Sequence, residues 1–164
     1  MRMNKFKKFT HLDSYGKVKM VNVSGKKQSF RTAEAVGYIV LNDEIIKKII
    51  ENKIQKGDVF ATAKIAGINA AKKNWELIPL CHQIKLTSID IGFEILDKEK
   101  KVEARSKVEG YDRTGVEMEA LTAVSVSLLA IYDMCKALSK DMKIGRIELV
   151  KKTGGKSDYF KEKD

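Results

Sequence analysis

Residues 114–136 (TGVEMEALTAVSVSLLAIYDMCK) form the segment that most limits how this chain can fold. They are apolar or small along the middle and charged at both ends. This pattern predicts one long, largely buried helix. Glu117 and Glu119 fall in its first turn, where the partial positive charge of a helix N-terminus favours carboxylates.

Asp133 and Lys136 fall near the other end of this predicted helix. A carboxylate is disfavoured there, because the C-terminus of a helix carries partial negative charge. The two residues are three positions apart, so their side chains share a face. They can act as a proton-transfer pair or as a surface ion pair that stabilises the helix, and these two residues alone do not separate the alternatives.

The length of the helix limits how these groups can share a site. Glu117 and Asp133 are sixteen residues apart, which in an unbroken helix is a rise of roughly 24 Å. One compact site on one helix cannot hold both. Either the ligand is elongated or neighbouring subunits complete each pocket. We expect the second arrangement, because a symmetric oligomer interface brings opposite helix ends together.

Alternating and turn-bounded segments indicate the rest of the fold. Strands are predicted where residues alternate or are rich in β-branched side chains, over residues 17–24, 32–41, 84–96, 102–108 and 143–152. Asn42 or Asp43 and Asp58 are candidate N-caps of two further helices. This order predicts an α+β, ferredoxin-like antiparallel sheet with helices packed on one face and an extra N-terminal strand.

The composition is that of one globular domain. The chain has 164 residues, 43 % hydrophobic and 33 % charged, enough for a single core over residues 1–164. A basic N-terminal arm, about 1–16, and a polar tail, about 153–164, are predicted to be flexible. Because we find no bilayer-length apolar run and no secretory signal, we expect a cytoplasmic location and no membrane partner.

The net charge of +10 favours an anionic partner: a nucleic acid, a phosphorylated small molecule or an acidic surface. A nucleic-acid-binding α+β module is the main alternative function, but aromatic residues are few and not interleaved with the lysines. The two cysteines and two histidines do not have the spacing of a metal site. No metal or cofactor is therefore required by the sequence.

Three short motifs could contact an anion. Lys56 lies in a turn before a predicted helix N-terminus, where phosphates bind readily. The segment 151–157 (KKTGGKS) offers lysines and exposed backbone N–H groups, although a flexible basic tail is the competing interpretation. His82 follows the only proline, Pro79, and could bind an anion, stack on a base or transfer a proton. A structural histidine bonded to the backbone is the alternative.

Taken together, these segments resemble one known family. The blocks are MVNVS, KGDVFATAKIAGINAAKKNWELIPLCHQI, TGVEMEALTAVSVSLLAIYDMCK and GGKS, and they are similar to the MoaC family, the cyclic pyranopterin monophosphate synthases of molybdenum cofactor biosynthesis. The resemblance implies a phosphorus–oxygen lyase that converts a cyclised dihydro-GTP, supplied by a radical SAM GTP cyclase, into cyclic pyranopterin monophosphate and pyrophosphate. It also implies a homohexamer, a trimer of dimers, with active sites at the dimer interfaces.

The resemblance also assigns roles to residues by motif position. It implies that Asp133 is the catalytic acid or base, that Lys136 is the second proton-transfer group and that Lys152 belongs to the catalytic set. Lys56 and Arg31 match polar positions that contact the triphosphate. A magnesium ion could accompany the triphosphate, although the sequence shows no ligand cluster for it.

Two further segments match substrate-binding positions of the family, and two single positions depart from it. Asn22 stands where the family often has aspartate, and Gln83 stands where the family commonly has proline. The loop after His82 is therefore expected to be less rigid than in most members. The predicted substrate-binding residues are Leu80, Cys81, His82, Glu117, Met118 and Glu119.

Overall fold

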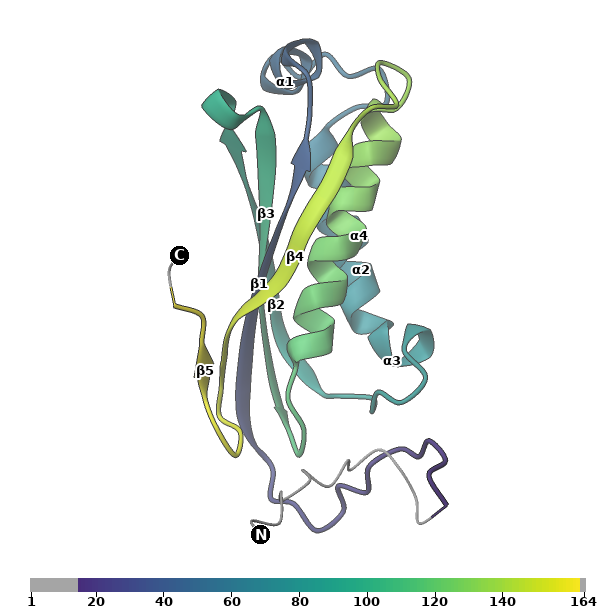
Figure 1. The fold of residues 1–164 in the computed structure, drawn as a ribbon, viewed down its shortest axis with the longest axis vertical. Helices are drawn as coiled ribbons and strands as arrows, with labels where there is room; N and C mark the ends of the chain where they lie inside the picture. Colours follow the sequence, from purple (N-terminus) through teal and green to yellow (C-terminus); the bar gives the residue numbers. More distant parts are fainter. Residues whose placement is uncertain (1–14, 163–164) are drawn as a thin grey trace, which may run out of the picture.

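The computed structural model describes residues 15–162, which form one antiparallel sheet covered on one face by helices (Figure 1). A short 3-10 turn, Asp97–Glu99, joins β2 to β3. In chain order the elements are β1 (Ser29–Val40), α1 (Asp43–Ile50), α2 (Val59–Lys72), α3 (Asn74–Leu77), β2 (Leu86–Leu96), β3 (Lys101–Asp112), α4 (Glu117–Cys135), β4 (Lys143–Thr153) and β5 (Tyr159–Phe160).

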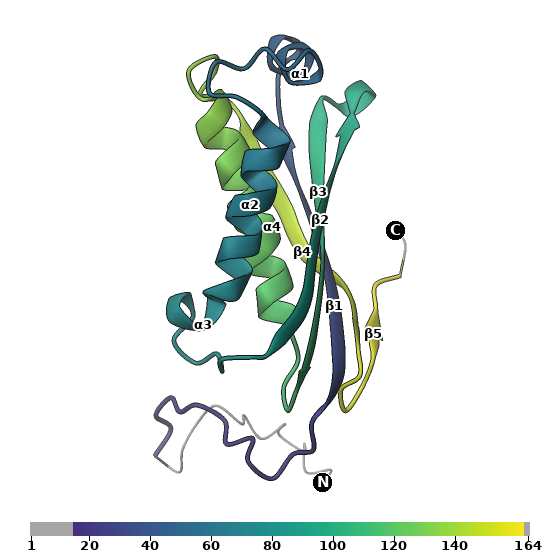
Figure 2. The same ribbon diagram turned by 180° about the vertical axis from the view of Figure 1, so that it is seen from behind.

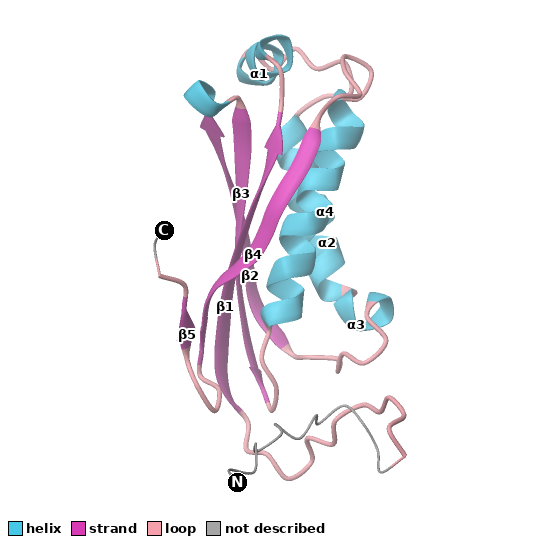
Figure 3. Cartoon of the chain, viewed as in Figure 1, coloured by secondary structure: helices cyan, strands magenta, loops and turns pink. Residues whose placement is uncertain are grey.

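The strand order in the sheet is β2-β3-β1-β4-β5, and every pairing is antiparallel. The helical segment between β1 and β2 therefore connects strands that have β3 between them. In the same way, α4 connects β3 and β4 across β1. This is the split β-α-β arrangement. The predicted α+β fold with an antiparallel sheet and helices on one face is confirmed (Figure 3).

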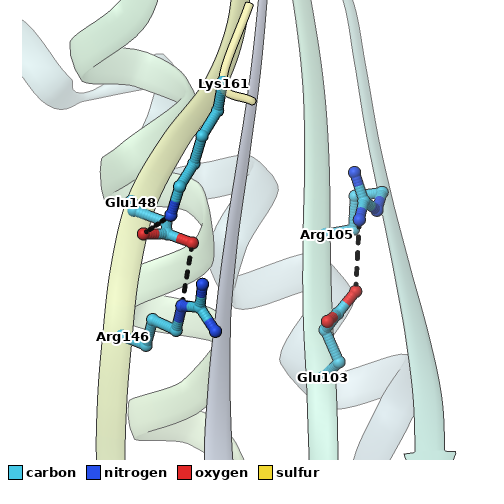
Figure 4. A network of polar contacts seen from close by, with 5 residues as sticks. All are labelled: Glu103, Arg105, Arg146, Glu148 and Lys161. Carbon is cyan, nitrogen blue, oxygen red and sulfur yellow. Dashed lines mark hydrogen bonds and ion pairs between the residues drawn. The ribbon is translucent and has the colours of Figure 1, made fainter. Parts of the chain in front are cut away.

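Side-chain alternation places the core between the sheet and the helices. On β3, Val102, Ala104, Ser106 and Val108 are fully buried, while the alternate residues Glu103, Arg105 and Lys107 face outward, as expected when one face of an antiparallel sheet is solvated. The outer face carries ion pairs (Figure 4). Arg105 contacts Glu103 at 3.3 Å. Glu148 accepts from Arg146 at 3.1 Å and from Lys161 at 2.6 Å.

Helix α4 is the central element of the core. Figure 2 shows it beside α2 over the same face of the sheet. Gly67 of α2 makes this close approach possible, because a Cβ there would lie 2.2 Å from Ser127 Oγ on α4. By length and composition alone α4 could cross a membrane, but half of its apolar window is buried inside the protein. The buried half of α4 belongs to the core, and apolar side chains such as Leu129 remain exposed on its outer face.

The N-caps of α1 and α2 are residues that the sequence predicted as caps. The Asn42 side chain accepts from the Ile45 N–H at 2.9 Å, and the Asp58 side chain accepts from the Ala61 N–H at 2.9 Å. These contacts begin α1 and α2 and satisfy N–H groups that a helix start leaves unpaired. Asn42 is therefore the cap of α1, rather than Asp43.

The predicted extra N-terminal strand over residues 17–24 is wrong. Val18 makes only an isolated bridge, and the segment runs beneath the end of the sheet nearest α3 (Figure 1). Val21 and Val23 instead line a hollow beside α4. The alternating apolar residues therefore contact this hollow and do not belong to a strand of the sheet. The fifth strand is β5, from the segment predicted as the polar tail, which pairs Tyr159 with Lys152.

Candidate active site

Two adjoining hollows lie at the N-terminal end of α4. The first, of about 650 Å³, lies between the start of β1, the end of β4 and the link from β3 to α4. The second, of about 370 Å³, lies between that link and residues 80–84. Four residues line both hollows: Lys26, Thr114, Gly115 and Glu117. Each volume is in the range of small-molecule sites, and the shared residues make the two hollows parts of one site.

The larger hollow, called the basic pocket below, has six cationic side chains among its fourteen lining residues. Its single acidic side chain, Glu117, accepts from Lys152 Nζ at 2.9 Å. Such a concentration of ammonium and guanidinium groups favours a multiply charged anion. The cationic lining residues are Lys26, Lys27, Arg31, Arg113, Lys152 and Lys156.

Gly154 gives the basic pocket a fixed wall. It has a φ of +81°, and a Cβ there would lie 1.9 Å from the carbonyl oxygen of Phe30. Its own carbonyl accepts from Ser29 Oγ at 2.8 Å, and its N–H donates to Asp158 at 3.1 Å. The predicted KKTGGKS motif is therefore an ordered turn against β1, and only glycine fits at its bend.

The smaller hollow, called the ring pocket below, has a different chemistry. Leu80, Ile84 and Met118 give it apolar walls. Two buried polar atoms have no hydrogen-bond partner among the described residues, His82 Nε2 and Glu119 Oε2. Both residues line the pocket. Buried polar atoms are nearly always bonded, so these two indicate where a ligand with its own polar groups would bind.

Burial raises the pKa values of two side chains in the ring pocket, Glu119 and Cys81. Glu119 is 3 % exposed. Burial raises its pKa above the ordinary value, and a hydrogen bond from Asn74 opposes the rise. Burial also raises the pKa of the Cys81 thiol, which keeps the thiol protonated and makes Cys81 a poor nucleophile. Its role in the pocket is therefore one of shape and contact.

A second charged cluster lies at the opposite end of α4. Asp133 lies between two ammonium groups, with Lys136 Nζ at 2.7 Å from Oδ1 and Lys56 Nζ at 2.8 Å from Oδ2. Hydrogen bonds from Lys136 first and Lys56 second lower the pKa of Asp133 to about 2. The hydrogen bond to Asp133 raises the pKa of Lys136. At neutral pH the cluster therefore holds one carboxylate between two cations.

The order and identity of these segments match one family over most of the chain. The model of the MoaC family matches residues 20–155, which include the ring pocket, the Asp133 cluster and every lining residue of the basic pocket except Lys156. The chain belongs to the MoaC family. This is the cyclic pyranopterin monophosphate synthase family of molybdenum cofactor biosynthesis, so the protein is a member of an enzyme family that acts in the biosynthesis of that cofactor.

Within one chain, the residues predicted from the MoaC resemblance form two groups. The first lines the basic pocket or the ring pocket. The second, Lys56, Asp133 and Lys136, lines neither. Helix α4 runs unbroken over 19 residues and has one group at each of its ends, so the two groups are far apart within one chain. The residues of the first group are Arg31, Leu80, Cys81, His82, Glu117, Met118, Glu119 and Lys152.

The structure adds residues that the sequence did not indicate. Lys26, Lys27 and Arg113 line the basic pocket, but in sequence they resemble the many lysines and arginines of a solvated surface. Asn74 is fully buried beside Glu119, although it lies in a polar stretch, KKNWE, without an apolar period. Among residues 15–162, no group of three or more His, Cys, Asp or Glu could hold a metal ion.

Proposed function

We propose that this chain is a cyclic pyranopterin monophosphate synthase that converts cyclised dihydro-GTP into cyclic pyranopterin monophosphate with release of pyrophosphate. The observation that supports it is the pair of adjoining hollows. One is lined by cations and suits a triphosphate, and the other is lined by apolar and hydrogen-bonding groups and suits a heterocyclic ring. A nucleoside triphosphate derivative has these two parts joined.

In this proposal the triphosphate lies in the basic pocket. Forming a cyclic monophosphate with loss of pyrophosphate requires a hydroxyl of the substrate to attack the α-phosphorus while the bond from that phosphorus to the bridging oxygen breaks. Negative charge then builds on the departing pyrophosphate. Lys27, Arg31 and Arg113 line the pocket where that charge develops, and fixed cations there would stabilise the transition state.

The heterocycle lies in the ring pocket. A carboxylate oxygen such as Glu119 Oε2 accepts hydrogen bonds from ring N–H groups, and His82 Nε2 can pair with a further polar atom. The substrate would thereby satisfy both of the atoms that lack a partner in the described chain. The walls formed by Leu80 and Met118 would cover the faces of the ring.

Asp133 and Lys136 supply proton exchange while the imidazole ring of the purine opens and the pterin forms. A carboxylate with a pKa of about 2 is a weak base while both lysines bind it. Phosphate oxygens compete for the ammonium groups of Lys56 and Lys136, and losing either contact raises the pKa of Asp133. Substrate binding would thus convert a stable ion cluster into an acid–base pair.

A second copy of the chain brings the two groups together. Two α4 helices related by a two-fold axis and running antiparallel would place Asp133 of one protomer near Glu117 of the other. The outer faces of α2 and α4 carry exposed apolar side chains that suit such contact, with Ile65 61 % and Leu129 57 % exposed. The homodimer would then be the catalytic unit, and three dimers would assemble into a hexamer.

Turnover of cyclised dihydro-GTP is the direct test. The parent protein should form the pterin product and one pyrophosphate per substrate, both measurable by mass spectrometry and a pyrophosphate assay. Asp133→Asn and Lys136→Ala should remain folded and lose turnover by roughly a hundredfold or more. Near-parental turnover in both variants, or no turnover by the parent, would refute the proposal.

A further inference from the structure

The Asn74 side chain connects α3 to helix α4 beside the ring pocket. Asn74 is the first residue of α3 and is fully buried. Its Nδ2 donates to Glu119 Oε1 at 2.8 Å, and its Oδ1 accepts from Thr122 Oγ1 at 2.7 Å. One amide therefore connects α3 with the first turns of α4.

The partners fix which way the amide points. An ionised carboxylate only accepts hydrogen bonds, so the Asn74 atom facing Glu119 must be the NH₂ group. The amide oxygen then faces the hydroxyl of Thr122, which can donate. Thr122 is one turn after Glu119 on α4, so the helix holds both partners of Asn74 at a fixed spacing.

This contact leaves one oxygen of Glu119 for a ligand. Oε1 is bonded to Asn74, whereas Oε2 is buried and has no partner among the described residues. Asn74 prevents the carboxyl from turning, because rotation would break their hydrogen bond inside a buried site. An acceptor fixed in this way selects a donor at one position in the pocket.

We propose that Asn74 is a positioning residue of the active site, which holds Glu119 so that only Oε2 is presented to an N–H edge of the ring bound in the ring pocket. This inference rests on the proposed function. Asn74 itself lines neither hollow, so it acts through Glu119 and does not touch the substrate. The fixed oxygen would distinguish a ring with N–H groups at that edge from one with acceptors there.

The charged and titratable neighbours of Glu119 decide what happens without Asn74. Burial is the largest cause that raises the pKa of Glu119, and repulsion from Glu117 is a smaller one. Lys26, Cys81 and His82 line the same pocket. A hydrogen bond from the backbone N–H of Glu119 lowers the pKa, and the hydrogen bond from the Asn74 side chain lowers it further. Removing the Asn74 hydrogen bond lets Glu119 protonate at a higher pH, and a protonated Oε2 no longer serves as an acceptor.

The test compares Asn74→Ala and Asn74→Asp with the control Asn52→Gly, which removes an exposed asparagine side chain after α1 at a φ of +51° that suits glycine. With cyclised dihydro-GTP as the substrate, both Asn74 variants should lose about tenfold to a hundredfold in kcat/KM. The acid limb of their pH profile should move to higher pH. The control should remain within twofold of the parent at every pH.

A second measurement does not depend on turnover. In protein labelled with ¹³C at the glutamate carboxyls, the Glu119 resonance should titrate at higher pH in Asn74→Ala than in the parent or in Asn52→Gly. Failure of the parent to turn over the substrate would refute the proposed function, while this titration still decides whether Asn74 controls Glu119. An unchanged Glu119 titration, or a kcat/KM within twofold of the parent in folded Asn74 variants, would overturn the inference.

Thr122→Val provides the variant for the case in which Asn74→Ala does not fold. It keeps the shape of the side chain and removes the hydroxyl that fixes the amide. It should shift the acid limb in the same direction and lower kcat/KM by about threefold to tenfold. A parental pH profile in folded Thr122→Val would also contradict the inference.

Discussion

Lys56 Nζ lies 2.8 Å from the carboxylate of Asp133 and 2.9 Å from its backbone carbonyl, although the two residues are 77 positions apart in the sequence. The contact joins the turn before α2 to the last turn of α4. A cation beside the carbonyl groups of a helix C-terminus is favourable. Lys56 therefore offsets the unfavourable placement of a carboxylate at that end of the helix.

Lys56→Met should raise the pKa of Asp133 above about 2, although Lys136 is the larger cause and still holds it below the ordinary value. A lowered carboxyl pKa stabilises the folded state above the unfolded pKa of about 3.9, and the stabilisation is lost as pH falls through the folded pKa. The difference in unfolding free energy between parent and variant should thus be constant above about pH 5 and shrink toward about pH 2.

An NMR titration of the Asp133 carboxyl and denaturant unfolding over that pH range measure both effects. Lys53→Met, at an exposed lysine paired with Glu51, is the control and should leave the Asp133 titration unchanged. If Asp133 titrates identically in Lys56→Met and the parent, the ion cluster does not set its pKa.

Mixed oligomers test whether the two ends of α4 meet between protomers. Glu117→Gln and Asp133→Asn chains should each be inactive alone, and equal co-expression should restore about a quarter of parental turnover. The fraction follows because half of the randomly formed dimers are mixed and each mixed dimer has one of two sites intact.

The control for this experiment is co-expression of Asp133→Asn with Lys136→Ala. Both residues lie at the same end of the same helix, so every site in a mixed dimer lacks one of them and turnover should not recover. Recovery in the control, or no recovery with Glu117→Gln, would contradict a site shared between protomers.

Gly154→Ala should destabilise the protein by about 2 kcal/mol or more, because a positive φ is strained for alanine and the new Cβ would meet the Phe30 carbonyl. Chemical denaturation measures the loss. Gly92→Ala, on the exposed side of β2 with nothing within 4 Å of the added Cβ, should be neutral or slightly stabilising. Equal stability of the two variants would show that the turn does not depend on glycine.

The basic pocket predicts a salt-sensitive Michaelis constant. Arg113→Ala and Lys27→Ala should each raise KM for cyclised dihydro-GTP by about tenfold, since each removes one charge-assisted contact, and should make KM less sensitive to salt. Lys98→Ala, in the exposed turn between β2 and β3, is the matched control and should leave KM unchanged. Steady-state kinetics at several salt concentrations separates these outcomes.

Several features of the fold were predictable because their cause is local. The apolar run of α4, the alternation along β2 and β3, and the caps at Asn42 and Asp58 all depend on neighbours within a few residues. The N-terminal strand was wrong for the opposite reason. A strand requires a partner edge, and the alternation at Val21 and Val23 cannot show that these residues cover a pocket instead.

In the candidate site, too, local geometry was predictable from the sequence and contacts between distant segments were not. The rise of an α-helix is fixed, so the sequence alone placed Glu117 and Asp133 too far apart for one compact site. The sequence could not show that Lys56 reaches Asp133, that Lys27 and Arg113 line the same hollow as Lys152, or that Asn74 is buried against Glu119. Those contacts join segments that are distant in the chain.

The sequence by itself determined the secondary structure of the core, the chemical types available for catalysis and the distance along α4 that separates them. These follow from periodicity, capping and helical rise, which act over one or two turns. Only the tertiary structure decided which lysines share a pocket and which oxygen of Glu119 is left without a partner. Burial and long-range contacts depend on how the sheet and helices pack, and packing joins residues that no local pattern connects.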